Sequence, residues 1–387
     1  MRVKSNRYIK GVKPVVIIMS FDIRVGGPII DDDDIQSVVE TLRQGRLSGG
    51  IFAEKFEKEF AEFTGVKHAI SVNSATAALQ LMLATNDIGV GDEVITTPYT
   101  FAATANVIIL QGAKPIFVDI ESNYYNIDST KIEEKITENT KAIMPIHYGG
   151  QISQMNEINK IAKKFNLLTF EDAAPAAGAK LNNKKAGSIG DAGAFSFFPD
   201  KNMTTGEGGM LTTDSDHIAE RARIMKKHGA PSRYHHTEIG WNFKMPDMNA
   251  ALGISQLKKL PNIIKKKNEL AKYYDDIFAD KLRGVVETPK TMKSCYHTFN
   301  IYNIKFENEI QRNKVKKHLE ENKIETRICF PPVHLQPIYS KLMNLKEGSF
   351  PISEKSSKNT LCLPMYANIS NQIQDNIVNH VKNVLGN

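Results

Sequence analysis

A regular alternation of short apolar segments and longer amphipathic segments between residues 68 and 170 is the strongest constraint on the fold of this chain. Strands that alternate with helices predict a mostly parallel sheet with helices on both faces. In such sheets, ligands bind beyond the carboxyl ends of the strands. The expected strands are residues 68–72, 93–97, 115–119, 142–147 and 167–170, and the expected helices include residues 104–111, 129–136 and 155–165.

Residues 194–213 form a second distinctive stretch. The apolar residues 194–198 predict a strand that ends at Pro199, and residues 210–213 predict another strand. Between them lie Lys201 and a glycine-rich turn, whose backbone can adopt positive φ and approach a ligand closely. An ammonium at a strand end, beside aromatic and small residues, loses solvation, which favours the neutral, nucleophilic amine. Taken alone, most lysines of this kind are ordinary surface residues.

The segment after residue 72 combines hydroxyl side chains with the start of a helix. Ser74 and Thr76 fall where a strand passes directly into a helix. The free backbone N–H groups of a helix N-terminus, together with such hydroxyls, form a site for an anion such as a phosphate. The alternative is a plain helix cap.

Several polar or aromatic residues are expected at the same edge of the sheet. Thr76, Asp172, Ser196 and residues 98–101 all follow closely on expected strand ends. Because the carboxyl ends of parallel strands gather ligands, these residues are candidates for one shared site.

The remaining pattern predicts how the chain divides. A helix is expected at residues 31–45, and Phe52, Phe56, Phe60 and Phe63 form a core-facing stripe on the next helix. A helix is expected at residues 216–227. A long helix is expected from Asp247, with an interruption at Pro261. A strand at residues 297–304 and a helix at 311–321 then follow. We therefore predict an N-terminal arm (1–34), a large domain (35–258) and a small C-terminal domain (259–387).

The composition argues against a disulfide-rich protein and a nucleic-acid-binding protein. The chain has 387 residues, a net charge of +7 and three cysteines, Cys295, Cys329 and Cys362, that form no close pair in the sequence. Neither a disulfide framework nor a metal site is indicated, and a cytoplasmic setting fits best. The densest basic run, Lys258, Lys259 and residues 265–267, is typical of a solvated helix face. No nucleic-acid motif is visible, and the positive charge also suits a phosphate-bearing small substrate.

The N-terminal segment needs its own interpretation. Residues 1–21 are basic and then briefly apolar, which superficially resembles a signal peptide, but no small-residue cleavage site follows. We expect a surface arm, or an extension before an internal start at Met19. No apolar run is long enough to span a bilayer, so no membrane partner is expected.

Together the pieces match the needs of pyridoxal phosphate. Its aldehyde requires a lysine, its ring nitrogen a carboxylate, its phosphate hydroxyls and helix-terminal N–H groups, and its ring a stacking partner. Lys201, Asp172, the segment around Thr76 and the segment 98–101 supply that set.

From about Ile35 to its C-terminus, the chain resembles the DegT/DnrJ/StrS family of nucleotide-sugar aminotransferases. These enzymes have fold type I and depend on pyridoxal phosphate. The resemblance implies an α/β fold with a mostly parallel seven-stranded sheet in the large domain and a smaller α+β domain after it. Residues 195–209 match most specifically. The other matching segments are residues 47–50, 73–79, 97–106, 171–174, 240–257 and 326–339.

The resemblance also implies a role for individual residues. Lys201 forms the Schiff base, and Asp172 pairs with the ring nitrogen of the cofactor. Phe101 stacks on the ring, with Tyr99 as the alternative, and Ala174 packs on the other face. The residues implied for phosphate binding are Ala75, Thr76 and Ser196, with Asn242 donated by the second subunit of a homodimer, and those near the sugar nucleotide are Arg327, His334 and Gln336.

Three positions depart from the pattern of the family. Ala75 replaces a frequent glycine, Pro175 a polar residue near the phenolic oxygen of the cofactor, and Ala177 a common histidine. These changes leave the Schiff base intact but put the substrate and the tuning of the ring in question.

Lys201 also discriminates between reactions, because family members that dehydrate sugars tend to carry histidine at this position. The resemblance therefore implies amino transfer, with L-glutamate as the expected donor and a nucleotide-linked keto-deoxysugar as acceptor. A perosamine-type 4-amination in polysaccharide precursor synthesis is the leading hypothesis. A sugar dehydratase or lyase and a non-catalytic regulatory protein are the alternatives, and the nucleotide and sugar stay open.

Overall fold

The computed structural model describes residues 21–45, 47–48 and 50–386 of the chain. The expectations for a signal-like segment, for a start at Met19 and for Gly49 lie outside these residues. The helices are α1 (Asp32–Gln44), α2 (Ile51–Thr64), α3 (Ala75–Ala84), α4 (Ala102–Leu110), α5 (Met155–Phe165), α6 (Asp216–Met225), α7 (Asp247–Lys281), α8 (Glu309–Glu321), α9 (Pro337–Met343), α10 (Pro351–Asn359) and α11 (Asn371–Leu385). The strands are β1 (His68–Val72), β2 (Glu93–Thr96), β3 (Lys114–Phe117), β4 (Thr140–Ile143), β5 (Leu168–Asp172), β6 (Lys180–Leu181), β7 (Lys184–Lys185), β8 (Ala192–Ser196), β9 (Gly209–Thr213), β10 (Cys295–Tyr296), β11 (Tyr302–Lys305) and β12 (Thr360–Leu363).

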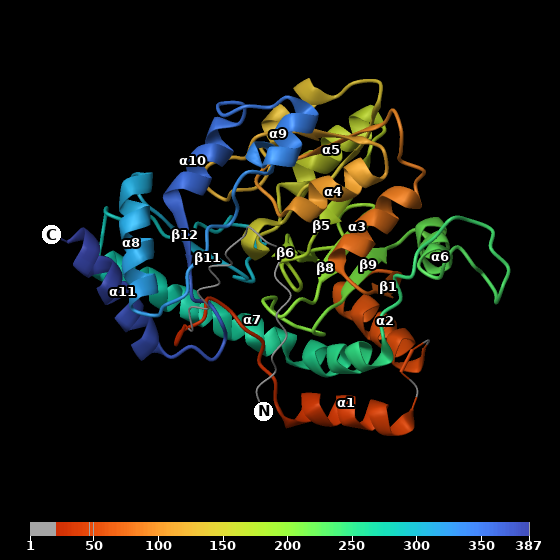
Figure 1. Cartoon of the computed structure of the whole chain (residues 1–387), viewed down its shortest axis with the longest axis horizontal. Coiled ribbons are helices and arrows are strands. Elements are labelled where there is room, and N and C mark those ends of the chain that lie inside the picture. Colours follow the sequence, from red (N-terminus) through yellow and green to blue (C-terminus); the bar gives the residue numbers. More distant parts are fainter. Residues whose placement is uncertain (1–20, 46, 49, 387) are drawn as a thin grey trace, which may run out of the picture.

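A seven-stranded sheet forms the centre of the larger part of the molecule (Figure 1). Its strand order is β1-β9-β8-β5-β4-β2-β3. The neighbours from β8 through β5, β4 and β2 to β3 are parallel, whereas β9 runs antiparallel to both β1 and β8. The predicted mostly parallel sheet is therefore confirmed, with β9 as the inverted strand.

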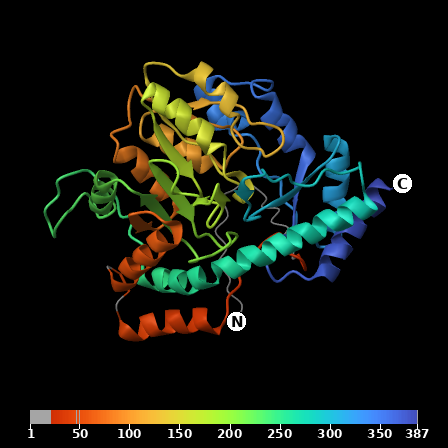
Figure 2. The ribbon, with the colours of Figure 1, turned by 180° about the vertical axis from the view of Figure 1, so that it is seen from behind.

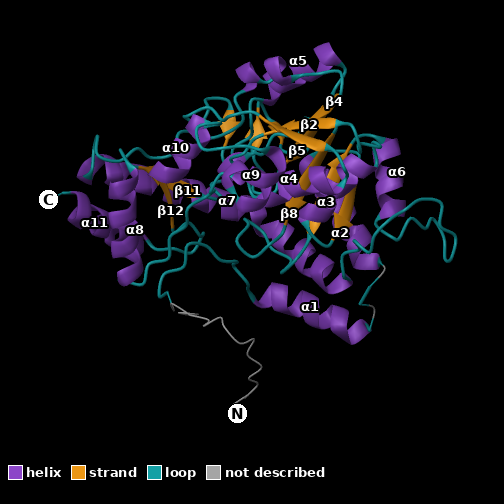
Figure 3. Cartoon of the chain, turned by 45° about the horizontal axis from the view of Figure 1, so that its top comes forward, coloured by secondary structure: helices purple, strands orange, loops and turns teal. Residues whose placement is uncertain are grey.

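Helices cover both faces of this sheet (Figure 3). Adjacent strand residues belong to different cores, because successive side chains of a strand point to opposite faces. Val94 and Ala194 lie in the core under α3, α4 and α6. Ile95 and Phe195, the next residues along, lie in the core under α2, α5 and α7. Helices on both faces explain why these strands read as continuous apolar runs rather than as alternating ones.

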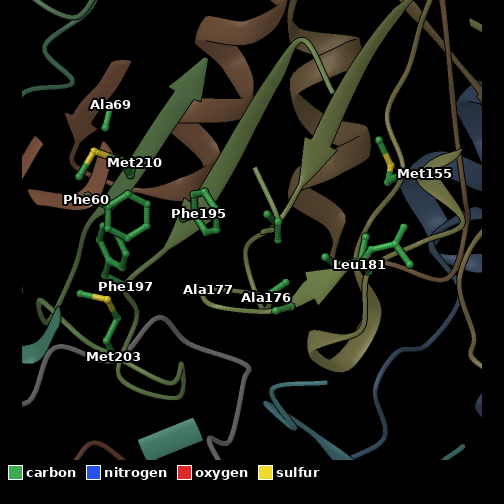
Figure 4. Close-up of a cluster of buried hydrophobic side chains, with 14 of the residues drawn as sticks. Phe60, Ala69, Met155, Ala176, Ala177, Leu181, Phe195, Phe197, Met203 and Met210 are labelled. Carbon is green, nitrogen blue, oxygen red and sulfur yellow. The ribbon is translucent and has the colours of Figure 1, made fainter. Parts of the chain in front are cut away.

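The predicted aromatic stripe of the second helix is confirmed as core packing. Phe56 and Phe60 of α2 are fully buried. The ring of Phe60 lies 5.0 Å from that of Phe195 and 5.5 Å from that of Phe197, in edge-on contacts. Figure 4 shows the rings of Phe60, Phe195 and Phe197 gathered with Met203 and Met210, and Phe195 belongs to β8, the strand before the turn of Lys201. The core thus supports the turn that carries the candidate lysine.

The prediction that Pro261 interrupts the long helix is wrong. Helix α7 continues through Pro261 from Asp247 to Lys281 and links the sheet to the C-terminal helices (Figure 2). Proline has no N–H for the carbonyl four residues earlier, which usually breaks a helix. Here Pro261 is exposed, and the buried Leu260 and Ile264 hold the helix on the core.

The C-terminal part of the chain has a core of its own. The antiparallel pair β11–β12 packs with α8, α11 and the second half of α7. The predicted boundary at residues 258 and 259 falls inside α7 and stays a prediction. Helix α1 runs along α7 (Figure 1), where Lys259 pairs with Asp34 at 2.9 Å and Gln256 donates to the same carboxylate at 2.8 Å.

Two smaller expectations also changed. The helix predicted at residues 129–136 is instead two single 3₁₀ turns, Ser129–Lys131 and Glu133–Lys135. So short a segment cannot offset the cost of nucleating an α-helix. The strand predicted at 297–304 is confined to β11, because Phe299 has a φ of 44°, which interrupts the extended backbone before it. No helix among the described residues is both long and apolar enough to cross a membrane.

Candidate functional site

A cavity of about 690 Å³ lies where β5 and β8 end and α3 begins. Asp172 is the last residue of β5 and Ser196 the last residue of β8. We call these two residues and the first turn of α3 the sheet wall. Other lining residues come from the C-terminal part of the chain, and we call Asn300, Arg327, Cys329 and Cys362 the C-terminal wall. The cavity therefore lies at the edge of the sheet where the sequence predicts a ligand.

Asp172 is a buried carboxylate with fixed hydrogen-bond donors. Its side chain accepts from the Thr104 hydroxyl at 2.7 Å and from the Ala174 N–H at 3.2 Å. Burial raises the pKa of Asp172, and the Thr104 hydrogen bond and the nearby charge of Lys201 oppose that rise. Such a carboxylate gains most from a cationic N–H partner in the cavity, because an unpaired buried charge is costly.

Lys201 lines the same cavity as Asp172. Its backbone N–H donates to the Phe198 carbonyl at 3.0 Å, which closes the turn after β8. Its Nζ lies 3.2 Å from Asp200 Oδ1, and Asp200 also pairs with Arg327 at 3.1 Å. The Lys201 amine and the Arg327 guanidinium of the C-terminal wall therefore share the carboxylate of Asp200.

The anion site predicted after β1 has the geometry of a helix N-terminus. The Ser74 hydroxyl accepts from the Ala77 N–H at 3.1 Å, so Ser74 caps α3. The N–H groups of Ala75 and Thr76 precede the first intrahelical donor and are left for a ligand. Both residues line the cavity with Ser196. The sequence leaves a helix cap and an anion site as alternatives. In the structure the Ser74 side chain can cap α3 while the N–H groups of Ala75 and Thr76 stay available for an anion.

Gly209 brings the pieces of this anion site together. It pairs with Val72 on one side and with Ser196 on the other, in the two antiparallel ladders of β9. A Cβ built on Gly209 would lie 2.4 Å from the Ser74 carbonyl carbon, so no side chain fits there. The absence of a side chain allows the start of α3 to lie directly against the glycine-rich turn.

Phe101, and not Tyr99, faces the cavity. The Phe101 side chain is exposed and lines the cavity together with Ala174 and Pro175. Tyr99 is fully buried, and its hydroxyl donates to the Cys329 carbonyl at 2.8 Å. Ala177 belongs to the buried core. Of the two aromatic candidates, only Phe101 is placed to stack on a bound ring.

Two further predicted residues lie outside this cavity. His334 is buried, its Nε2 lies 3.0 Å from Glu354 Oε1, and its ring packs edge-on against Phe350. Asn242 is exposed in the loop before α7, where its carbonyl accepts from the Asn73 side chain at 3.2 Å. Substrate contact by His334 thus has no support in this geometry. The role of Asn242 in the site of a second subunit stays a prediction.

Lys267 is a residue that sequence reasoning missed. The basic run at residues 265–267 was expected to be solvated, but Lys267 is only 4% exposed. Its Nζ donates to Asn202 Oδ1 at 2.7 Å, and Asn202 in turn donates to the Thr298 carbonyl at 3.0 Å. Burial lowers the pKa of Lys267 to about 7. The helical spacing could have indicated this burial. Lys267 lies three or four residues from four apolar residues that are buried on the same helix face, Ile263, Ile264, Leu270 and Ala271.

Thr104, Asp200 and Asn300 were also missed. Thr104 and Asp200 hold the predicted Asp172 and Lys201, as described above. Asn300 lines the cavity, and its Oδ1 is buried with no hydrogen-bond partner among the described residues. An acceptor left unpaired beside a cavity indicates a ligand donor. Thr104 and Asp200 lie in segments that match the family, but their contacts with Asp172 and Arg327 depend on tertiary structure, as does the position of Asn300 at the cavity.

Comparison with known proteins agrees with this geometry. The model of the DegT/DnrJ/EryC1/StrS aminotransferase family matches residues 28–382. The chain is 41% identical over 374 residues to the spore coat polysaccharide biosynthesis protein SpsC of Bacillus subtilis, covering 92% of this chain and 96% of that protein. It is 37% identical over 368 residues to a GDP-perosamine synthase of Caulobacter vibrioides, covering 94% and 98%.

A solved structure also aligns over almost the whole chain. It is that of PseC from Helicobacter pylori, an aminotransferase involved in the biosynthesis of pseudoaminic acid. The TM-score is 0.89 at 30% sequence identity, and the alignment covers 94% of this chain and 99% of PseC. With a family model that spans most of its length and relatives of this similarity, the chain belongs to the DegT/DnrJ/EryC1/StrS aminotransferase family.

Proposed function

We propose that this chain is a pyridoxal-phosphate-dependent aminotransferase that aminates a nucleotide-linked keto-deoxysugar for polysaccharide synthesis. The observation that carries the proposal is that Lys201 and Asp172 open into one cavity beside the N-terminus of α3. The named relatives SpsC and GDP-perosamine synthase support the substrate class. A reducing, cytoplasmic setting suits such a biosynthetic step.

The residues of the cavity fit the cofactor. Among the described residues the carboxylate of Asp172 forms no ion pair, and its two donors are neutral, so it is available to hold a protonated ring nitrogen. The first turn of α3 and Ser196 would hold the phosphate, since a helix N-terminus favours an anion. Phe101 and Ala174 would flank the ring. A cavity of about 690 Å³ is within the usual range for small-molecule sites.

When bound, pyridoxal phosphate supplies the electron sink for the reaction. The residues of this chain supply attachment and proton transfer. The Nζ of Lys201 would hold the cofactor through its aldehyde carbon and, when free, would carry a proton to and from the substrate carbon. Asp200, 3.2 Å from Nζ, keeps the amine oriented in the turn. A positioned group of this kind contributes about 10²–10⁴-fold to the rate.

The donor and the position of amination are the finer part of the proposal. L-Glutamate is the proposed donor, and 4-amination of the perosamine type is the proposed outcome. Arg327 on the C-terminal wall has a planar set of donors that suits the diphosphate of the substrate or the carboxylate of the donor. Asn242 would complete the phosphate site of a second subunit in a homodimer.

The test is amino transfer with a panel of nucleotide-linked 3-keto and 4-keto deoxysugars and L-glutamate. We expect an amino sugar and 2-oxoglutarate in equal amounts with a 4-keto acceptor, detected by mass spectrometry. Release of a dehydrated sugar would instead assign the protein to the dehydratases. Failure with all acceptors, although the cofactor reacts with glutamate, would reject the proposed acceptor class.

A further inference from the structure

Two cysteines that are far apart in the sequence lie together in the cavity. Arg327 and Cys362 form an antiparallel bridge, in which the Arg327 N–H donates to the Cys362 carbonyl at 3.2 Å and the Cys362 N–H donates back at 2.8 Å. Cys329, two residues after Arg327, lies on the same face of this pair. Both cysteines line the cavity, and each thiol affects the pKa of the other, so the two side chains are neighbours.

The neighbouring groups keep this pair in place. Both cysteines are free and line the cavity. The hydroxyls of Tyr99 and Tyr148 donate to the Cys329 carbonyl at 2.8 and 2.5 Å, which fixes its backbone. Cys362 belongs to β12 and is held by the ladder with β11. The two cysteines therefore have fixed backbones on the C-terminal wall, and both line the cavity that ligands enter.

The surroundings give the two thiols different reactivity. The hydrogen bond from Cys362 lowers the pKa of Cys329 despite its burial, and the positive charges of Arg327 and Lys201 act in the same direction. The negative charge of Asp200 acts in the opposite direction and raises the pKa of Cys329. Burial raises the pKa of Cys362 well above its usual value. Because the thiolate is the nucleophile, Cys329 is the thiol that reacts first.

We propose that Cys329 is an oxidation site inside the substrate cavity, with Cys362 as the thiol that resolves it to a disulfide. The oxidant is a hydroperoxide such as hydrogen peroxide. The Cys329 thiolate attacks one peroxide oxygen, so that an S–O bond forms, the O–O bond breaks and hydroxide leaves. Sulfur loses two electrons and the peroxide gains them, which gives a sulfenic acid and, after protonation of the hydroxide, water.

The second step joins the two cysteines in a disulfide. The sulfur of Cys362 attacks that of Cys329, the S–S bond forms, the S–O bond breaks, and hydroxide leaves with the Cys362 proton as a second water. In total, two thiols and one peroxide give one disulfide and two waters. The new bond would join β12 to the segment of Arg327, on the wall that faces the proposed nucleotide sugar. Oxidation should therefore reduce sugar amination reversibly.

The primary test uses the purified full-length holoenzyme and hydrogen peroxide. After treatment, free thiols are alkylated and the peptides are analysed by mass spectrometry. We expect a cross-link between the peptides of Cys329 and Cys362, loss of the cross-link with dithiothreitol, and an alkylated Cys295. This readout depends on no assay of the sugar reaction, so it stands or fails separately from the proposed function. An excess of nucleotide sugar should slow the cross-link if the cavity binds it.

Cys295 provides the matched control. It lies outside the residues that line the cavity, and burial raises its pKa to about 11. Cys295→Ser should leave both activity and the cross-link unchanged. We expect alkylation of Cys329 in the untreated protein to be at least about tenfold faster than that of Cys295 at neutral pH, because its thiolate fraction is larger.

A resolving-residue variant separates the two steps. In Cys362→Ser, the sulfenic acid of Cys329 should persist long enough to be trapped by dimedone and should proceed to the irreversible sulfinic acid. The proposal is overturned if the wild-type protein forms no cross-link while Cys295 becomes oxidised, or if Cys329 and Cys295 are alkylated at equal rates. It is also overturned if the cross-link forms but leaves sugar amination at its full rate.

Discussion

The two walls of the cavity are built in different ways. The sheet wall takes its residues from the ends of strands and the start of a helix, so the backbone fixes them, and Asp172 is held by two donors. The C-terminal wall takes Cys362 from β12 and its other residues from segments outside the strands, and the Arg327 side chain is 43% exposed. In the proposed function, the sheet wall and the adjoining Lys201 would carry the chemistry, whereas the C-terminal wall would bind the substrate and respond to oxidation.

The strongest test of that division is Lys201→Ala. Loss of the proton carrier alone should lower turnover by about 10²–10⁴-fold, and loss of covalent attachment should add to this. The visible absorbance of lysine-bound pyridoxal phosphate should disappear. Lys265→Ala, an exposed lysine of α7, is the control and should keep both. An unchanged absorbance in Lys201→Ala would assign the cofactor to another lysine.

Asp172→Asn should separate activity from stability. Removing one partner of a buried ion pair costs about 3–5 kcal/mol, so we expect a loss of activity of more than about hundredfold. The raised pKa means that the folded protein binds the Asp172 proton more tightly than the unfolded chain does. The stability of the cofactor-free protein therefore falls as pH rises above the ordinary Asp value of 3.8.

The consequence can be measured by thermal unfolding of the cofactor-free protein. Relative to the wild type, Asp172→Asn should be more stable at pH 7, and the difference should shrink as the pH approaches 4. If the variant is less stable than the wild type at both pH values, burial of the ionised Asp172 carboxylate does not destabilise the folded protein.

On the C-terminal wall, Arg327→Ala should act on binding. Hydrogen bonds to charged groups contribute about 1.5–3 kcal/mol, so the KM for the nucleotide sugar should rise by about 10–100-fold. The kcat should change by less than about threefold. Arg327→Lys should recover part of the loss, because the charge remains without the planar set of donors. A fall in kcat at constant KM would place Arg327 with the chemistry.

The smallest kinetic effect is expected for His334→Ala. His334 lies outside the cavity and contacts Glu354, so KM and kcat should stay within about twofold. The free energy of unfolding should fall by about 1–3 kcal/mol, because the buried Glu354 loses a partner. Steady-state kinetics and urea unfolding of the same preparation distinguish this outcome from a role in substrate binding, which would raise KM at unchanged stability.

The same contrast between walls explains what the sequence could predict. Thr76, Asp172 and Ser196 were found because strand ends gather at one edge of a parallel sheet. Lys267 was wrongly predicted to be solvated, because it belongs to a run of lysines although it lies on the apolar face of α7. Pro261 was misjudged because tertiary packing outweighs local propensity. The pairing of Cys329 with Cys362 depends on a long-range bridge that no local pattern encodes.

Direct backbone contact at Gly209 has a consequence for any attempt to redesign this enzyme. Val72, Ser196 and the start of α3 all meet at that residue, with no room for even a methyl group. A side chain at Gly209 would displace the start of α3 from Ser196, and these are the two parts of the proposed phosphate site. Cofactor affinity is therefore better altered at positions other than Gly209.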